Sequence, residues 1–151
     1  MPLERVTAMH VERQRLDEHA HVVGASAFLV MARPLAPAAA PRSVLIGHLI
    51  GACVALACLW VAGLLHAQNA LVLPLGWSRA AAVAASMGLT GALMVAFGAV
   101  HPPASATTML VSLGLLVRPE HLAALFAATV LVTAHAFVAH RLAGTPYPLW
   151  R

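Results

Sequence analysis

Acidic residues are almost absent from the middle of this chain. The stretch 20–119 contains no Asp or Glu, and its only charged residues are Arg33, Arg42, Arg79 and Arg118. Of the 151 residues, 9% are charged and 61% are hydrophobic, whereas roughly a quarter of a typical soluble domain is charged. A soluble domain of this composition would have too little polar surface to stay dispersed. The sequence therefore predicts an integral membrane protein.

Lysine is absent and cysteine is scarce. Every basic residue is Arg, and the formal net charge is +4. No basic patch is interleaved with aromatic residues, so this charge indicates contact with lipid headgroups rather than with nucleic acid. The two cysteines, Cys53 and Cys58, lie five positions apart in one apolar stretch and would point in different directions on a helix. They suit neither a disulfide with one another nor a cysteine-based zinc site.

Three apolar stretches are long enough to cross a bilayer, which needs about 20 residues. They are Val44–His66, Ala80–Val100 and His121–Leu142. Two further apolar stretches, Val22–Ala32 and Ala104–Val117, are too short, because a helix rises about 1.5 Å per residue and the hydrocarbon core is about 30 Å thick. Such segments are typical of half-helices around a site near the middle of the membrane. We therefore expect an all-α, polytopic membrane protein with about three full spans and two short or re-entrant half-helices.

The beginning of the chain has a different composition. Met1–His21 holds four of the five acidic residues together with three arginines, which predicts a solvated or interfacial segment. Residues 22–151 form the predicted transmembrane domain. Within it, the linker Pro34–Arg42 contains three prolines and is expected to be stiff and largely non-helical.

The run His101–Thr108 interrupts the apolar pattern. Two successive prolines cannot lie inside a continuous helix, because each lacks an N–H and clashes with the preceding turn. A helix arriving from Ala80 must therefore stop near His101, and a new helix can start on the prolines. We expect unpaired N–H groups around Ala104–Ala106, next to the hydroxyls of this run. A helix start of this kind is a ready site for an anion.

Other residues could complete such a site. Gly24 and Ser26 could form the start of a second half-helix, and Gly47 begins a Gly-x-x-x-Gly step that permits close helix packing. His48 and His101 could donate hydrogen bonds to an anion or carry a proton; alternatively, they bond to backbone carbonyls freed by the prolines. Arg42 could attract anions or contact headgroups. The predicted anion pathway consists of His101, Pro102, Pro103, Ala104, Ser105, Thr107, Thr108, His48, Gly47, Gly24, Ser26 and Arg42.

Several of these segments resemble a known family. Gly24-Ala25-Ser26-Ala27-Phe28, the stretch Ala40–His48, His101-Pro102-Pro103-Ala104-Ser105-Ala106-Thr107 and the closing Arg141, Tyr147-Pro148 and Trp150 are similar, in order, to the HPP family of small integral membrane proteins. That family is named after its His-Pro-Pro motif, and some plant-plastid and cyanobacterial members are linked to nitrite transport. The resemblance implies a nitrite or small-anion transporter and makes residues 22–151 an HPP-like transmembrane domain.

The sequence departs from this family in two places. Members usually carry a further membrane helix where this chain has the polar segment Met1–His21, so we expect either a shortened member or a chain start that is not the natural one. His140 stands before Arg141 where the family would have Asn.

Two other function classes remain open. His48, His101 and His135 could gather a metal in a membrane enzyme, but the acid-free stretch lacks a general base and any His-Glu-x-x-His motif. The chain could also be an accessory subunit of a larger transporter. We expect no enzyme activity, cofactor or metal. The expected partners are the lipid bilayer, a small anion and further copies of the chain, because so small a chain can hardly enclose a solvated path alone; we expect a bacterial inner membrane.

Overall fold

The computed structural model describes residues 22–72, 76–148 and 150, and all regular elements among them are helices. The polar segment Met1–His21 lies outside these residues. After the short helix Val22–Ala32, the described elements are the 3₁₀ helix η1 (Pro37–Ala39), α2 (Pro41–Val61), α3 (Trp77–Ala96), α4 (Ala104–Ser112) and α5 (Pro119–Leu142). Three of them, α2, α3 and α5, are long and apolar enough to cross a membrane. The all-helical prediction with three spans and short helices is confirmed.

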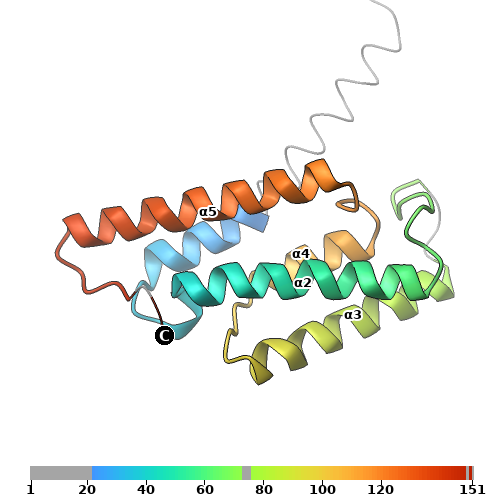
Figure 1. Ribbon diagram of the computed structural model, residues 1–151, viewed down its shortest axis with the longest axis horizontal. Helices are drawn as coiled ribbons and strands as arrows, with labels where there is room; N and C mark the ends of the chain where they lie inside the picture. Colours follow the sequence, from blue (N-terminus) through green and yellow to red (C-terminus); the bar gives the residue numbers. More distant parts are fainter. Residues whose placement is uncertain (1–21, 73–75, 149, 151) are drawn as a thin grey trace, which may run out of the picture.

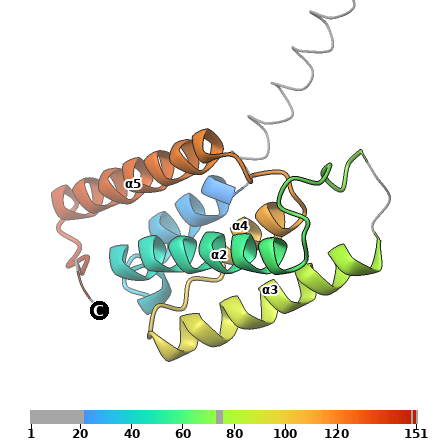
Figure 2. The same cartoon turned by 45° about the vertical axis from the view of Figure 1, so that its right-hand side comes forward.

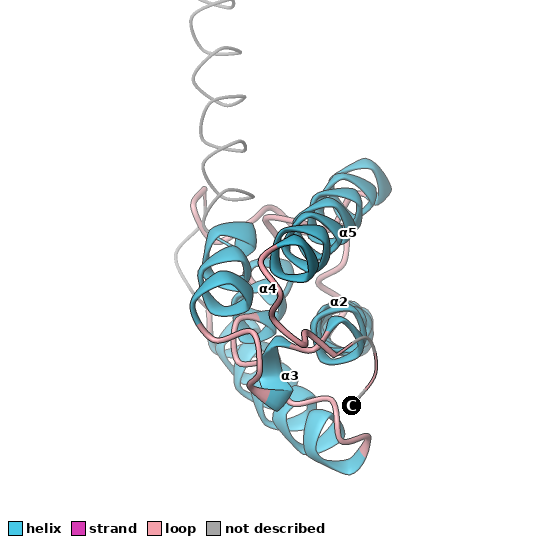
Figure 3. Cartoon of the chain, turned by 90° about the vertical axis from the view of Figure 1, so that its left-hand side faces the viewer, coloured by secondary structure: helices cyan, strands magenta, loops and turns pink. Residues whose placement is uncertain are grey.

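Helix α2 lies at the centre of the molecule. It contacts α3, α4, α5 and η1 (Figure 1), and the turned view in Figure 2 shows the same arrangement. In the end-on view of Figure 3, α5 and α3 lie on opposite sides of α2. Pro41 can begin α2 because the first helical position needs no N–H partner. Within the predicted linker, therefore, Arg42 is already helical and Pro37–Ala39 forms a 3₁₀ turn.

Two glycines end the helices beside the proline break. Helix α3 ends at Ala96, five residues before His101, because Gly98 adopts a positive φ of 57° and its N–H bonds to the Val95 carbonyl. The expected end near Val100 was therefore too late. Gly114, with φ 85°, ends α4 in the same way, so this helix has 9 residues and is shorter than the predicted stretch.

Helix α4 starts at half the depth of α2. Gly51 is the middle residue of the 21-residue α2. A Cβ added to Gly51 would lie 3.0 Å from the carbonyl oxygen of Ala104, the first residue of α4. Since α2 is long enough to span the membrane, the break at His101–Pro103 lies inside the span, and α4 is a half-helix.

The helix Val22–Ala32 packs on the α5 side of α2. Val30, Ala39, Val44 and Ala136 form one buried apolar cluster that joins this helix, η1, α2 and α5. The tail after α5 also returns to this end, because the buried Tyr147 hydroxyl donates a 2.6 Å hydrogen bond to the Ala39 carbonyl. These contacts fix η1 against the N-terminal half of α2, where the proline break packs beside Gly47.

Candidate functional site

Four buried side chains from four segments form one hydrogen-bonded chain, which we call the histidine network. Ser26 Oγ lies 2.9 Å from Nε2 of His48 and 2.9 Å from Nε2 of His101. His48 Nδ1 lies 2.7 Å from Thr107 Oγ1, and His101 Nδ1 lies 2.7 Å from the Ala38 carbonyl oxygen. The two imidazole rings are 5.2 Å apart, centre to centre. The network therefore joins the helix Val22–Ala32, α2, the proline break and α4.

The partners determine where the protons of the network lie when both rings are neutral. A carbonyl only accepts, so His101 Nδ1 carries a proton, and its bare Nε2 accepts the Ser26 hydroxyl. The Ser26 oxygen then accepts from His48 Nε2–H, which leaves His48 Nδ1 to accept the Thr107 hydroxyl. The hydrogen bonds thus run in one direction, from Thr107 through His48, Ser26 and His101 to the Ala38 carbonyl.

The histidine network is sealed. His48, His101 and Thr107 are 0% exposed and Ser26 is 1% exposed. Each of its N–H and O–H donors already has an acceptor within the chain of bonds. In this arrangement, an anion would find neither space nor a spare donor at the network. Passage of a solute here would require these bonds to rearrange.

The expected free N–H groups at the start of α4 are not there. The N–H groups of Ala104, Ser105 and Ala106 bond to the carbonyls of the three preceding break residues, His101, Pro102 and Pro103, at 3.0–3.1 Å. The two prolines thus begin a tight turn that leads into α4, and this turn uses the donors itself. The prediction of an open helix terminus for an anion was wrong, because bonds between residues three apart satisfy the first turn.

The other predicted pathway residues fall into two groups. Gly47 lies against the network, since a Cβ there would be 2.9 Å from the Cβ of His101. Thr108, next to Thr107, bonds to Thr90 of α3 at 3.2 Å. By contrast, Gly24 is exposed with no atom within 4 Å of its built Cβ position, and Ser105 bonds back to the Pro102 carbonyl.

Arg42 bonds to backbone carbonyls near the proline break, a role that the sequence had suggested for His48 and His101. Its guanidinium donates to the carbonyls of Phe97 and Gly98 at 2.8 and 2.9 Å. These carbonyls follow the end of α3, where no continuing helix supplies backbone donors. His101 also bonds to a carbonyl, but this carbonyl belongs to Ala38 in η1.

Sequence reasoning missed three partners of this region. The Ala38 carbonyl and Thr90 gave no signal beyond a proline-rich linker and a run of small residues. Arg79 is 6% exposed, and it donates to the carbonyls of Gln68 and Ser112, the last residue of α4. A single arginine beside a long apolar stretch is the feature of the sequence that could have indicated it.

The three histidines of the metal alternative do not come together. His135 is exposed on α5, away from the buried His48 and His101. Across the described ranges 22–72, 76–148 and 150, there is no group of three or more His, Cys, Asp or Glu side chains that could hold a metal ion.

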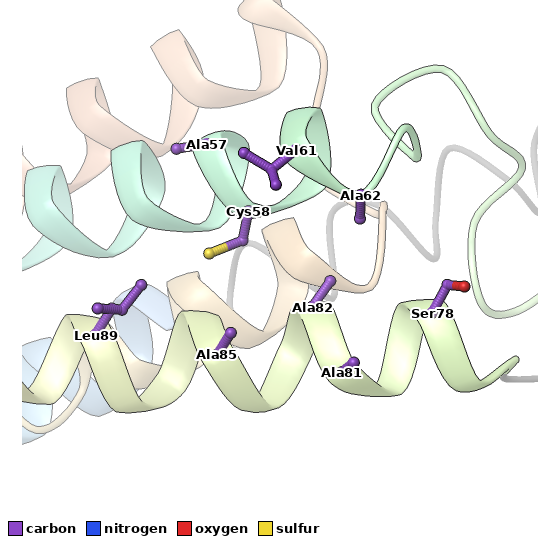
Figure 4. Close-up of a pocket in the computed structure, with 9 residues that line it drawn as sticks. All are labelled: Ala57, Cys58, Val61, Ala62, Ser78, Ala81, Ala82, Ala85 and Leu89. Carbon is purple, nitrogen blue, oxygen red and sulfur yellow. The ribbon is translucent and has the colours of Figure 1, made fainter.

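A wide groove between α2 and α3 is lined mainly by apolar side chains, with one hydroxyl from Ser78. It has a volume of about 610 Å³, and Cys58 of α2 faces Ala82 and Ala85 of α3 across it (Figure 4). Both cysteines are free thiols, and Cys53 is exposed. Such a lining offers no donor set to an ion and suits lipid chains or another helix.

The three candidate spans, the half-helix and the buried polar centre define a polytopic helical membrane protein. The model of the family described as HPP, transmembrane region, matches residues 9–148. The chain therefore belongs to the HPP family of integral membrane proteins, and it contacts the lipid bilayer. The search of curated proteins and the search of solved structures gave no match.

Proposed function

We propose that this protein passes a small anion, nitrite by its family resemblance, across the membrane, and that the histidine network is the gate on its path. The observation that carries the proposal is the position of the network at a half-helix that starts in the middle of the span. Ionisable side chains at this depth are costly and usually mark a solute or proton pathway.

The charges of the described residues support an anion as the solute. Glu120 is the single acidic residue among the described residues and lies at the start of α5. The polar groups within the span are hydroxyls and imidazoles, and the buried charge of Arg79 is positive. Groups of this kind stabilise an anion and give a cation no carboxylate to bind. Weak donors without a fixed charge at mid-depth also let the anion leave again.

The order of the hydrogen bonds supports coupling of anion movement to protons. Each neutral ring uses one bare nitrogen to accept a hydroxyl, His48 from Thr107 and His101 from Ser26. Protonation turns that nitrogen into a donor, which breaks the bond and adds a positive charge beside the path. Burial disfavours the charged rings while the network is closed, so the proton is taken up as the network opens. We therefore expect acid to favour the open network and anion flux to be several-fold higher at pH 6 than at pH 8.

The test is nitrite flux into proteoliposomes that hold the purified chain, at pH 6 and pH 8. His101→Ala removes one of the two rings of the network, and His135→Ala is the matched control because this histidine is exposed on α5. We expect flux above that of empty liposomes, and higher at pH 6 than at pH 8, for the wild type and the control. His101→Ala should lose most of this pH difference, because the substitution breaks the closed network. Equal flux in all four preparations would contradict the proposal.

One observation also supports assembly with other helices. Only 28% of the apolar window of α3 is buried, and Gly88 and Gly91 have nothing within 4 Å of their built Cβ positions. Small residues on an open face allow another helix to approach closely. We infer that the working unit is a homo-oligomer; an accessory subunit of a larger transporter is the alternative. The mass of the protein in detergent distinguishes them, since a monomer without flux of its own would favour the accessory role.

A further inference from the structure

A second polar region lies at the opposite end of α4 from the proline break. It is a cavity of about 410 Å³ between the loop after α2 and the segment that joins α4 to α5. We call it the polar cavity. Its polar lining consists of His66, Gln68, Asn69, Arg118 and His121. His66, Gln68 and Arg118 are exposed, so the cavity opens at the surface of the protein.

A buried positive charge lies directly behind the cavity wall. Arg79 is 6% exposed and donates to the carbonyl of Gln68 at 2.8 Å. A Cβ added to Gly114, another lining residue, would lie 2.8 Å from Nη1 of Arg79. Among the residues that the structure describes, the one ion pair joins Arg118 to Glu120, so Arg79 has no acidic partner there. A buried charge is screened much less than an exposed one.

The donors of the cavity are suited to an anion. The amide oxygen of Asn69 accepts a hydrogen bond from the N–H of Leu71. The NH₂ group of this side chain is therefore left as a donor for a ligand. Arg118 adds a guanidinium at the rim, partly balanced by Glu120 at 3.5 Å. With Arg79 behind the wall, the cavity carries more positive than negative charge.

Buried hydroxyls of α4 lie between the polar cavity and the histidine network. Arg79 donates to the carbonyl of Ser112, the last residue of α4. Ser112 and Thr108 lie one turn apart on α4, and both are 0% exposed. The next residue of this face, Thr107, bonds to His48. The buried face of α4 thus leads from the cavity to the network.

We propose that the polar cavity is a loading site for small inorganic anions, held by the field of Arg79 and the donors of the surrounding loops. The assignment of this site as the start of a transmembrane path rests on the proposed function, whereas anion binding itself does not. The site differs from the histidine network in that it has open space and a net positive charge.

Binding is measured without transport, from the broadening of the chloride NMR line by the purified protein in a detergent of zero net charge, with nitrite as competitor. Arg79→Met should weaken chloride binding about tenfold or more, since this charge is buried close to the cavity. Because this variant could lose its fold, exposed charges give a second measure. Arg118→Gln should weaken binding roughly twofold to threefold, and Glu120→Gln should tighten it by a similar factor. Arg33→Gln, an exposed arginine at the other end of the molecule, should change nothing.

Flux measurements separate this proposal from the proposed function. If the cavity loads the path, Arg118→Gln and Glu120→Gln shift the nitrite concentration at half-maximal flux in opposite directions and leave the maximal rate unchanged. Equal chloride broadening by the wild type, Arg118→Gln and Glu120→Gln, or no broadening by the wild type, would overturn the loading site whatever the flux. Broadening that depends on these charges, without any nitrite flux, would support the anion site. The same result would contradict the proposed transport function but not the site.

Discussion

The histidine network and the polar cavity contain similar groups but use them in opposite ways. In the network, each N–H and O–H donor has an acceptor, and the side chains are sealed from the surface. The polar cavity has space, exposed donors and a buried arginine without an acidic partner in the described part of the chain. A region that holds an anion needs spare donors, whereas a barrier needs none. The comparison therefore supports the two proposals that the polar cavity binds the anion and that the histidine network gates its path.

Helix α4 lies between the two regions and contacts both of them. Helix α4 starts beside the network and ends at Arg79, so its position against α2 sets both regions at once. The close approach of α4 to α2 occurs at Gly47 and Gly51, where side chains would collide with His101, Ala104 and Thr108. A shift of α4 should therefore disturb the network and the cavity together.

The largest effect is expected from Gly51→Ala. The new Cβ would lie 2.6 Å from Thr108 Oγ1 and 3.0 Å from the Ala104 carbonyl oxygen. Backbone at that distance cannot yield without moving α4, so we expect a loss of about 3 kcal/mol in the free energy of unfolding, near the upper end for overpacking. The measurement is unfolding in mixed detergent micelles.

Gly88→Ala on α3 is the matched control, because no atom lies within 4 Å of the position of its Cβ. Since alanine favours a helix over glycine, its stability should be unchanged or slightly raised. Equal losses in both variants would show that Gly51 is not a close-contact position.

The second-largest effect is expected from the loss of the Ser26 bridge in the histidine network. Ser26→Ala removes the oxygen that bridges His48 and His101 and leaves two buried ring nitrogens without their partner. Buried polar groups that lose a partner cost about 1–3 kcal/mol each, so we expect a loss of about 2 kcal/mol in total, since the rings can adjust. Ser86→Ala is the control: this serine is equally buried but bonds to the Ala82 carbonyl within its own helix. A similar loss of unfolding free energy in both variants would mean that the Ser26 bridge stabilises the fold no more than an ordinary buried hydroxyl.

The sequence predicted those parts of the fold that depend on local patterns. Apolar length predicted the three spans, and the two prolines predicted the break before α4. Composition could not show where α3 ends, because Gly98 stops it through a positive φ that a glycine-rich apolar run does not reveal. It also could not show that a tight turn at the prolines uses the N–H groups of the next helix.

The site was predicted as a set of residues but not as an arrangement. Both histidines and Ser26 were singled out from the sequence, yet the bridge joins residues 75 positions apart, and tertiary packing alone creates it. Gly24 shares a motif with Ser26 but lies on the exposed side of its helix, since residues two apart on a helix do not face the same way. Arg79 was missed because its importance depends on burial behind a cavity formed by two distant loops.

The smallest effect concerns the support of the network at η1. Tyr147 donates to the Ala39 carbonyl, next to the Ala38 carbonyl that accepts from His101. Tyr147→Phe should lower the free energy of unfolding by about 1 kcal/mol, the usual value of one hydrogen bond.

Burial raises the pKa of the Tyr147 phenol above its ordinary value. The contribution of the hydroxyl is therefore complete below the pKa of the unfolded chain, about 10, and is lost as the pH rises through the folded value. The stability difference between wild type and Tyr147→Phe should thus be constant from pH 7 to pH 9 and shrink above pH 10. Because Tyr147 is the single tyrosine of the sequence, tyrosinate absorbance reports its titration directly. A titration midpoint in the folded protein at or below that of a free tyrosine would contradict a buried, hydrogen-bonded hydroxyl. It would also contradict the support of η1, and through it of His101, by Tyr147.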